Sequence, residues 1–267
     1  MPTLIFDCDG VLADTEPSGH LPAFNRTFAE LGLVDDFGSP LIWTESEYAN
    51  KVVIGGGKER MMTLLTPAFI QRNNLPTDEA AQRAMLAAWH ERKTSVYTRL
   101  IESGAVPARP GIRRVAKEAH AAGWQLAVAS TSAERSVRAV LSHAVGEKLA
   151  ATFTIFAGDI VTRKKPAPDI YLLAVEALSA CQEDTIVVED SAAGMAAAHA
   201  AGLPVIVTQS AYTAGDDTSS AVLAVTSLGD ENEPAEVVSD PFALLPGTQL
   251  GIKDLTAALL ASRKTTV

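Results

Sequence analysis

The sequence contains only two cysteines and no apolar run long enough to cross a membrane. Cys8 and Cys181 show no metal-ligand spacing, and Cys8 stands between two aspartates, where a disulfide would be awkward. We therefore expect a reducing compartment. No window of about eighteen apolar residues occurs, so we expect no membrane-spanning helix. The chain opens on a strand-like segment without a basic leader, which favours a cytoplasmic protein over a secreted one.

Positive charge is also scarce, because 32 acidic residues outnumber 22 basic ones and give a formal charge of −10. This balance argues against broad binding of nucleic acid or of anionic membranes. An anionic small molecule is still compatible with it, provided that its pocket carries its own cations. With 267 residues, 47% of them hydrophobic, the chain can bury one sizeable core and a smaller satellite.

Short apolar runs recur along the chain, and most of them end at a polar turn that leads into a helical pattern. The expected strands are Thr3–Phe6, Gln125–Ala129, Thr154–Ala157, Ile186–Val188 and Pro204–Val207. The expected helices between and after them are Ile112–Ala122, Glu134–Leu141, Asp169–Leu178 and Ala192–Ala201. Strands that alternate with helices predict an α/β fold with a doubly wound parallel sheet.

One segment, from about Pro17 to Arg99, interrupts this alternation. It contains helix-like stretches and little strand signal; the stretches are Leu21–Leu31, Ser46–Val52, Glu59–Leu65 and Asp78–Leu100. We predict a core domain formed by residues 1–15 and 104–267, and an inserted helical domain formed by residues 16–103. Asp230–Pro246 is acidic and punctuated by prolines, which predicts a loop or tail on the surface.

Two aspartates follow the first strand, in the sequence Asp7-Cys8-Asp9-Gly10. Ligands of open parallel sheets bind outside the carboxyl ends of the strands. One of the two carboxylates could attack phosphorus while the other handles the proton of the leaving group. Because such carboxylates repel each other, we expect a divalent cation, and Glu189-Asp190 at the end of another strand would complete a Mg²⁺ site. Taken alone, the motif is equally typical of an Asx turn.

Further residues favour the catalytic interpretation. Ser130 follows an apolar strand and offers a hydroxyl and backbone N–H groups to phosphate oxygens. Lys165 supplies a positive charge that can offset the aspartates. Gly194, in the helix after Glu189-Asp190, permits close packing.

The ordered set Asp7, Asp9, Ser130, Lys165 and Glu189-Asp190 resembles the four-motif signature of the haloacid dehalogenase superfamily. The resemblance covers nearly the whole chain and implies a Rossmann-like core with an inserted helical type 1 cap domain. It implies that Asp7 is the nucleophile, and that Asp9 is the general acid and then the base. It also implies that Ser130 and Lys165 bind the transferring phosphoryl group.

The same resemblance implies a Mg²⁺ site. Its ligands would be Asp7, the backbone carbonyl of Asp9, and Asp190, with Glu189 as a ligand or a neighbouring carboxylate. The dehalogenase branch has no acid at the position of Asp9, so its presence favours phosphate esters as substrates. The expected enzyme is a Mg²⁺-dependent phosphatase.

The inserted segment contains a glycine-rich turn, Gly55-Gly56-Gly57-Lys58-Glu59-Arg60. Glycines let the backbone approach an anion, and two basic side chains near a helix start favour negative charge, so we favour an anion site here. A flexible turn with solvated basic side chains is the alternative.

Four other residues of this segment are candidates for contact with a substrate. Glu16 could accept a hydrogen bond from a sugar hydroxyl, or it could be an ordinary surface carboxylate. His20 could reach the same pocket, although a lone histidine is more often structural. His90 and Lys93 lie three apart on one helix and could meet a second phosphate, or form a solvated helix face.

These stretches resemble the CbbY-type phosphatases within the superfamily. That branch hydrolyses xylulose 1,5-bisphosphate, an inhibitory by-product of Rubisco in the Calvin cycle, to xylulose 5-phosphate. The resemblance implies a sugar-bisphosphate substrate bound by Glu16, His20, Gly56, Gly57, Lys58, Arg60, His90, Lys93, Thr131 and Ser132.

Several alternatives stay open at this point. A phosphosugar mutase of the beta-phosphoglucomutase type would use the same aspartates, and a generalist sugar-phosphate phosphatase would share the core motifs. A non-catalytic sensor would not need the intact set Asp7, Asp9 and Lys165. We expect a monomer with a small-molecule sugar phosphate as its partner, and with neither nucleic acid nor membrane bound. Its expected location is the cytoplasm, or the plastid stroma if the chain is a processed organellar protein.

Overall fold

The computed structural model describes residues 1–263, and the chain divides into two compact units. An α/β unit contains Met1–Asp14 and the chain from Pro107 onward, and a helical unit contains Thr15–Val106. Within the described residues, no helix is both long enough and apolar enough to cross a membrane.

The α/β unit is built on a seven-stranded sheet with the order β3-β2-β1-β4-β5-β6-β7. All neighbouring strands are parallel except β6 and β7, which are antiparallel. The strands are β1 (Thr3–Phe6), β2 (Gln125–Ser130), β3 (Thr154–Ala157), β4 (Thr185–Glu189), β5 (Val205–Thr208), β6 (Leu223–Val225) and β7 (Val237–Ser239). The predicted α/β class with a doubly wound parallel sheet is confirmed.

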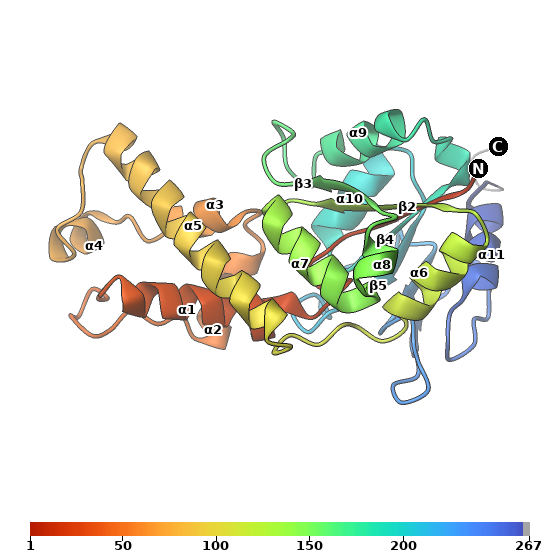
Figure 1. The fold of residues 1–267 in the computed structure, drawn as a ribbon, viewed down its shortest axis with the longest axis horizontal. Coiled ribbons are helices and arrows are strands. Elements are labelled where there is room, and N and C mark those ends of the chain that lie inside the picture. Colours follow the sequence, from red (N-terminus) through yellow and green to blue (C-terminus); the bar gives the residue numbers. More distant parts are fainter. Residues whose placement is uncertain (264–267) are drawn as a thin grey trace. The chain divides into compact units, whose positions relative to one another are not determined.

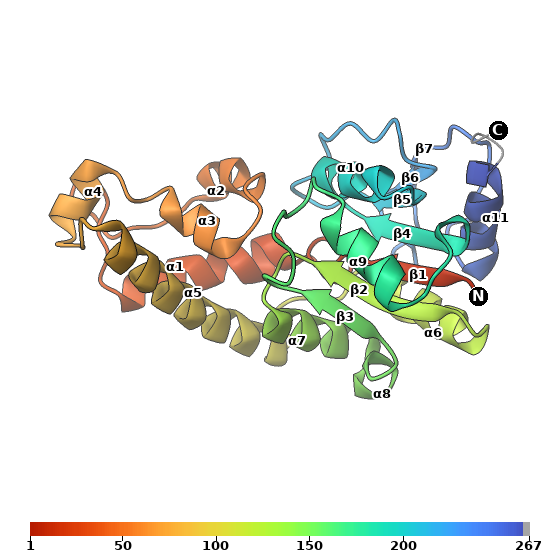
Figure 2. The ribbon, with the colours of Figure 1, turned by 90° about the horizontal axis from the view of Figure 1, so that it is seen from above.

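Helices cover both faces of this sheet (Figures 1 and 2). On one face lie α9 (Asp169–Ala177) and α10 (Ala192–Ala200), and on the other lie α6 (Ile112–Ala121), α7 (Glu134–Val145) and α11 (Ile252–Arg263). Two short pieces, α8 (Glu147–Ala150) and the 3₁₀ helix η2 (Gln182–Asp184), belong to the connections. Because both faces are covered, β1 and β4 are buried along their whole length rather than at alternate residues.

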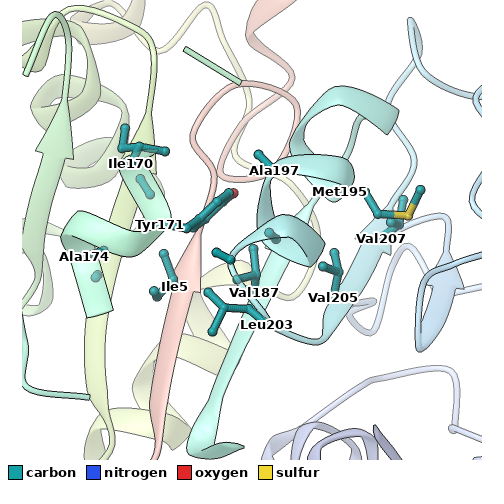
Figure 3. Close-up of a cluster of buried hydrophobic side chains, with 14 of the residues drawn as sticks. Ile5, Ile170, Tyr171, Ala174, Val187, Met195, Ala197, Leu203, Val205 and Val207 are labelled. Atoms are coloured by element: carbon teal, nitrogen blue, oxygen red, sulfur yellow. The ribbon is translucent and has the colours of Figure 1, made fainter. Parts of the chain in front are cut away.

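The core between the sheet and the helices α9 and α10 consists of small and branched side chains (Figure 3). Ile5 on β1, Val187 on β4 and Val205 on β5 are fully buried there, in one cluster with Ile170 and Tyr171 of α9. Burying one such aliphatic side chain contributes about 1.5–3 kcal/mol. This packing holds the carboxyl ends of β1, β2 and β4 in register.

The helical unit contains the π-helix η1 (Glu16–His20), α1 (Leu21–Glu30), α2 (Glu45–Val52), α3 (Gly57–Met62), α4 (Pro67–Arg72) and α5 (Glu79–Glu102). Capping residues define where two of these helices begin. Thr44 and Glu47 form a capping box at the start of α2, and the Asp78 carboxylate accepts a hydrogen bond from the Ala81 N–H at the start of α5. Its interior is aromatic, with Phe24 and Phe28 of α1 against Trp43 and Tyr48.

Several elements differ from the expectation. The strand β7 lies inside Asp230–Pro246, which we expected to be a loop or tail, and β6 was not expected either. Both have only three residues, too few to show a periodic pattern, and β7 is a half-exposed edge strand. The helices α4 and α11 were also not anticipated.

The two chain crossings between the units are hydrogen-bonded to each other within the α/β unit. Ala13 and Ala108 form an antiparallel bridge, the Arg109 N–H donates to the Leu12 carbonyl at 3.0 Å, and the Asp14 N–H lies 3.4 Å from the Pro107 carbonyl. The chain therefore leaves the α/β unit and returns to it at one place.

Candidate active site

Asp7 is the first residue after β1, and the fold buries it. Its N–H donates to the Val188 carbonyl of β4 at 2.9 Å, and its side chain lies at the carboxyl edge of the sheet. Gly10 has φ +79°, and a Cβ atom on it would lie 2.1 Å from a carboxylate oxygen of Asp190. The glycine of the motif is thus required both by its backbone conformation and by the acidic side chain packed against it.

Lys165 links the nucleophile candidate to a second acid. Its ammonium donates to Asp7 Oδ1 at 2.5 Å, to Glu189 Oε1 at 2.6 Å and to the Ala129 carbonyl at 2.9 Å. Since an ammonium has three N–H bonds, these acceptors account for all of them. Lys165 engages only one oxygen of Asp7, so the other stays available for chemistry.

Glu189 and Asp190 end β4, and both are buried. Glu189 Oε2 accepts from the Asp190 N–H at 3.1 Å, and Asp190 Oδ2 lies 3.4 Å from the Thr213 hydroxyl. A Cβ atom on Gly194 would lie 2.0 Å from the Glu189 carboxyl, so the expectation that Gly194 permits close packing is confirmed. Among the described residues, Asp7, Glu189 and Asp190 each offer a carboxylate oxygen, and these oxygens lie within 4.8 Å of one another.

The protonation equilibria reflect this crowding of acids. Burial, together with the charges of Glu189 and Asp9, raises the pKa of Asp7 to about 7 despite the attraction of Lys165. The pKa of Asp190 is raised well above its usual range by burial and then by Glu189 and Asp7. Burial opposes the charge on Lys165, yet the two acids it contacts hold its pKa well above the ordinary value. One ammonium therefore does not neutralise the cluster, and a bound cation would.

A serine that follows β2, Ser132, contacts the Asp9 carboxylate directly. The Ser132 hydroxyl donates to Asp9 Oδ2, and the Ser132 N–H donates to the Ser130 hydroxyl at 3.1 Å. Ser130 is buried at the end of β2, and Thr131 lies half-buried between the two serines. The Asp9 carboxylate is thus oriented by a serine and is not one of the three clustered carboxylates.

Two further side chains lie at this edge of the sheet: Tyr171, which was not predicted to belong to the site, and Arg109, which could from its sequence context either reach the site or cap a loop. The Tyr171 hydroxyl donates to Glu189 Oε1 at 2.5 Å. The Arg109 guanidinium donates to the carbonyls of Gln209 and Thr226, just beyond β5 and β6. From sequence alone, a tyrosine in an apolar helix is interpreted as a residue of the hydrophobic core. The only available signal was its place six residues after Lys165.

In the helical unit, Glu16 is buried and ion-paired with Arg60. The two terminal nitrogens of the Arg60 guanidinium, Nη1 and Nη2, each donate to one Glu16 oxygen at 3.0 Å, and the Tyr48 hydroxyl donates to Glu16 Oε2 at 2.5 Å. The remaining N–H bonds of Arg60 go to Tyr48 and to the carbonyls of Ile54 and Val52. Glu16 is therefore not a surface carboxylate, and Arg60 is not a solvated side chain.

The second group of candidates in this unit surrounds Lys93. This lysine is only 4% exposed, and its ammonium lies 2.5 Å from His20 Nδ1 and over the rings of Phe24 and Tyr97. A solvated helix face does not describe Lys93. His90 is half-buried one turn earlier on α5.

The glycine-rich turn lies beside this second group. Gly56 has φ +104° and precedes α3, and a Cβ atom on Gly57 would lie 2.7 Å from the His90 ring. Lys58 is half-buried at the start of α3. Its charge contributes, after burial and Lys93, to lowering the pKa of His90 to about 4. Lys58 and Lys93 thus place two positive charges beside His90, and with this pKa the His90 ring is neutral near pH 7.

Comparison with known proteins agrees with this geometry. The profile of the haloacid dehalogenase-like hydrolases matches residues 1–202. A CBBY-like protein of Arabidopsis thaliana is 43% identical over 230 residues, which is 86% of this chain and 70% of the relative. Protein CbbY of Cupriavidus necator is 37% identical over 238 residues, or 88% of each chain.

A solved structure has the same fold. It is a CbbY variant from Rhodobacter sphaeroides in complex with xylulose 1,5-bisphosphate, with a TM-score of 0.72 and 35% identity. The match covers 85% of this chain and 95% of that one.

Proposed function

The chain belongs to the haloacid dehalogenase-like hydrolase family and is a phosphatase, and from this premise we propose that it is a Mg²⁺-dependent sugar-bisphosphate phosphatase. Its best-supported substrate is xylulose 1,5-bisphosphate, which it would convert to xylulose 5-phosphate. A monomer in the cytoplasm, or in the plastid stroma if the chain is a processed organellar protein, is part of this proposal.

The arrangement that carries the proposal is the buried contact of Lys165 with both Asp7 and Glu189. A merely structural ion pair would place one cation against one acid. Here three buried carboxylates lie together and the ammonium contacts only two of them, and such a cluster of acids destabilises the fold unless it binds something positive. Strongly perturbed carboxylates at the carboxyl edge of a parallel sheet are typical of an active site.

The residues present fit a hard divalent cation. Asp7, Asp190 and the backbone carbonyl of Asp9 would supply oxygen ligands, with Glu189 as a further ligand or a neighbouring acid, and oxygen is the donor that Mg²⁺ prefers. When bound, the cation would offset the charge of the carboxylates and of the phosphoryl oxygens.

The chain's own residues would carry out the reaction in two stages. In the first, Asp7 attacks phosphorus, the bond to the sugar oxygen breaks, and Asp9 gives its proton to that oxygen. In the second, Asp9 takes a proton from water, the water oxygen attacks phosphorus, and Asp7 is released with inorganic phosphate. Ser130 would donate to the phosphoryl oxygens, the positive charge of Lys165 would attract them, and Ser132 would orient Asp9.

The helical unit would recognise the rest of the substrate. Lys58 and Lys93, next to Gly56 and Gly57, would attract the phosphate that is not transferred because their ammonium groups are positively charged, and the neutral His90 ring would donate a hydrogen bond to it. Glu16 would accept from a sugar hydroxyl, and Arg60 and Tyr48 would hold it in that orientation. His20, Thr131 and Ser132 complete the proposed contacts. Binding energy from the distant phosphate would raise the rate as well as the affinity.

The deciding experiment is a panel of sugar mono- and bisphosphates with Mg²⁺, ranked by kcat/KM. We expect a strong preference for xylulose 1,5-bisphosphate over ribulose 1,5-bisphosphate. A flat ranking would contradict the substrate and leave a generalist sugar-phosphate phosphatase. Isomerisation of a hexose 1-phosphate without release of phosphate would instead identify a mutase of the beta-phosphoglucomutase type.

A further inference from the structure

We propose that Tyr171 is a positioning residue of the active site, which holds Glu189 and Lys165 so that the ammonium meets Asp7. The inference rests on the proposed phosphatase function, since it assigns a role within that site. Tyr171 would touch neither substrate nor phosphorus. It would act through the two side chains between it and the nucleophile.

Hydrogen bonds connect the Tyr171 hydroxyl to Asp7 through Glu189 and Lys165. Its hydroxyl donates to Glu189 Oε1 at 2.5 Å, and the same oxygen accepts from Lys165 Nζ at 2.6 Å. Lys165 Nζ in turn donates to Asp7 Oδ1 at 2.5 Å. A continuous path of three hydrogen bonds therefore joins α9 to the nucleophile.

The ring of Tyr171 contributes separately from its hydroxyl. The Lys165 ammonium lies 4.9 Å from the ring centroid, within the range of a cation–π contact. In a buried site such a contact stabilises the charged form of the lysine. The ring thus supports the ammonium, and the hydroxyl fixes the carboxylate that the ammonium contacts.

Glu189 needs this support because it is buried and negatively charged. Its other oxygen accepts from the Asp190 N–H, so with Tyr171 and Lys165 both oxygens are held. Burial, and then Glu189, raise the pKa of the Tyr171 phenol well above its ordinary value, so the hydroxyl stays a neutral donor. Removal of the hydroxyl would leave Oε1 with Lys165 alone, and the shared ammonium would be drawn away from Asp7.

The alternative is that Tyr171 only fills the core. It does belong to the apolar cluster of Figure 3, between Ile170 and Ala174 of α9 and the sheet. Phenylalanine would fill that space equally well, whereas the hydroxyl ends on a carboxylate of the active site. A packing role predicts no effect on turnover when the hydroxyl alone is removed.

The test compares Tyr171→Phe with the control Ile170→Val, a buried change on the same helix and in the same cluster. We expect Tyr171→Phe to lower kcat about tenfold with KM rising no more than about threefold, because the hydrogen bond that it removes ends on a charged carboxylate. Ile170→Val should lower Tm and leave kcat unchanged. Tyr171→Leu, which also removes the ring, should lower kcat further.

A double-mutant cycle with Glu189→Gln tests the route of the effect. If Tyr171 acts through Glu189, adding Tyr171→Phe to Glu189→Gln should change kcat less than about twofold, since coupled residues are not additive. A full tenfold loss in that background, or a Tyr171→Phe single variant within twofold of the wild type, would overturn the proposal.

Binding of inorganic phosphate to the Mg²⁺-loaded protein, measured by calorimetry, separates this proposal from the proposed function. Failure of the wild type to hydrolyse any sugar phosphate would refute the function alone. Phosphate affinity should still fall about threefold or more in Tyr171→Phe and stay unchanged in Ile170→Val, because Lys165 would be displaced. Equal affinities in both variants would refute the role of Tyr171.

Discussion

Among the single side chains, Asp7 has the environment most specific to catalysis. It is buried beside two further acids, and its pKa is raised to about 7, yet Lys165 donates to one of its oxygens. A residue needed only for folding would not be kept in such surroundings, because a neutral side chain of the same shape would be more stable there.

Replacing Asp7 by asparagine should therefore separate activity from stability. We expect Asp7→Asn to reduce phosphate release at least about a thousandfold, since the nucleophile is lost. The folded state should be retained, because one charge leaves a crowded acidic cluster. Phosphate release and circular dichroism would be measured on the same preparation. Unchanged phosphate release would refute the mechanism.

His90 predicts a pH dependence of stability in the helical unit. Its pKa is lowered to about 4 by burial, then by the positive charges of Lys93, Lys58 and His20, with only partial opposition from Glu59. An unfolded histidine titrates near 6.5. The unfolded state therefore binds more protons between these two values, and the free energy of unfolding falls as the pH drops from about 6.5 towards 4.

The full effect of this histidine is on the order of 3 kcal/mol. Urea unfolding of the wild type and of His90→Asn at pH 5 and pH 7.5 measures it. The wild type should lose more stability at pH 5 than the variant does. Equal losses would show that His90 titrates normally in the folded protein.

The residue scale is also where the sequence was most informative about the core site. Asp7, Asp9, Ser130, Lys165, Glu189 and Asp190 were all identifiable, because each stands at the end of an apolar strand or beside a proline turn. The sequence did not predict which of these side chains would contact each other. The contacts of Ser132 with Asp9, and of Arg60 with Glu16, depend on distances that neither spacing nor composition determines.

Among the elements, the first turn of α10 has the strictest packing requirement. Ser191 caps this helix by accepting from the Gly194 N–H at 3.1 Å, and the same turn passes directly against the Glu189 carboxyl. The helix can approach β4 this closely only without a side chain at residue 194.

Gly194→Ala should accordingly disturb the site and the fold together. The new Cβ atom would lie 2.0 Å from a buried carboxyl that is held by hydrogen bonds, so we expect a loss of about 1–3 kcal/mol in unfolding free energy. Mg²⁺ affinity should fall as well. Gly247→Ala is the matched control, because no atom lies within 4 Å of its Cβ position, and it should change stability by less than about 0.5 kcal/mol. Similar stabilities for the two variants would contradict this account.

Elements with a clear period were predictable, and very short ones were not. The expected range Thr3–Phe6 coincides with β1, and Ile112–Ala122 differs from α6 by one residue. The strands β6 and β7 are three residues long and are the last two strands at one end of the sheet, where pairing with a neighbour, not an apolar pattern, defines them.

For the whole molecule, the net charge of −10 and the buried acid cluster have a common consequence. The folded protein concentrates negative charge at one place, so a cation that binds there stabilises the folded state and not the unfolded chain. Stability should therefore depend on the concentration of divalent metal.

Adding Mg²⁺ should raise Tm, and a chelator should reverse the effect. At a concentration 100 times Kd, the expected gain in unfolding free energy is about 2.7 kcal/mol. The control Asp190→Asn, which removes one of the three clustered carboxylates, should show a much smaller gain. Equal shifts in both proteins would place the metal elsewhere. Calorimetric melting curves with and without Mg²⁺ decide the matter.

The bridge between Ala13 and Ala108 has a consequence for how this chain could be re-engineered. Because the two connecting segments pair with each other inside the α/β unit, the helical unit Thr15–Val106 is an insertion whose ends are held together without it. If the helical unit recognises the sugar, as proposed above, replacing it at this junction by that of a relative with another specificity should change the preferred substrate, while β1 and β4 keep their register.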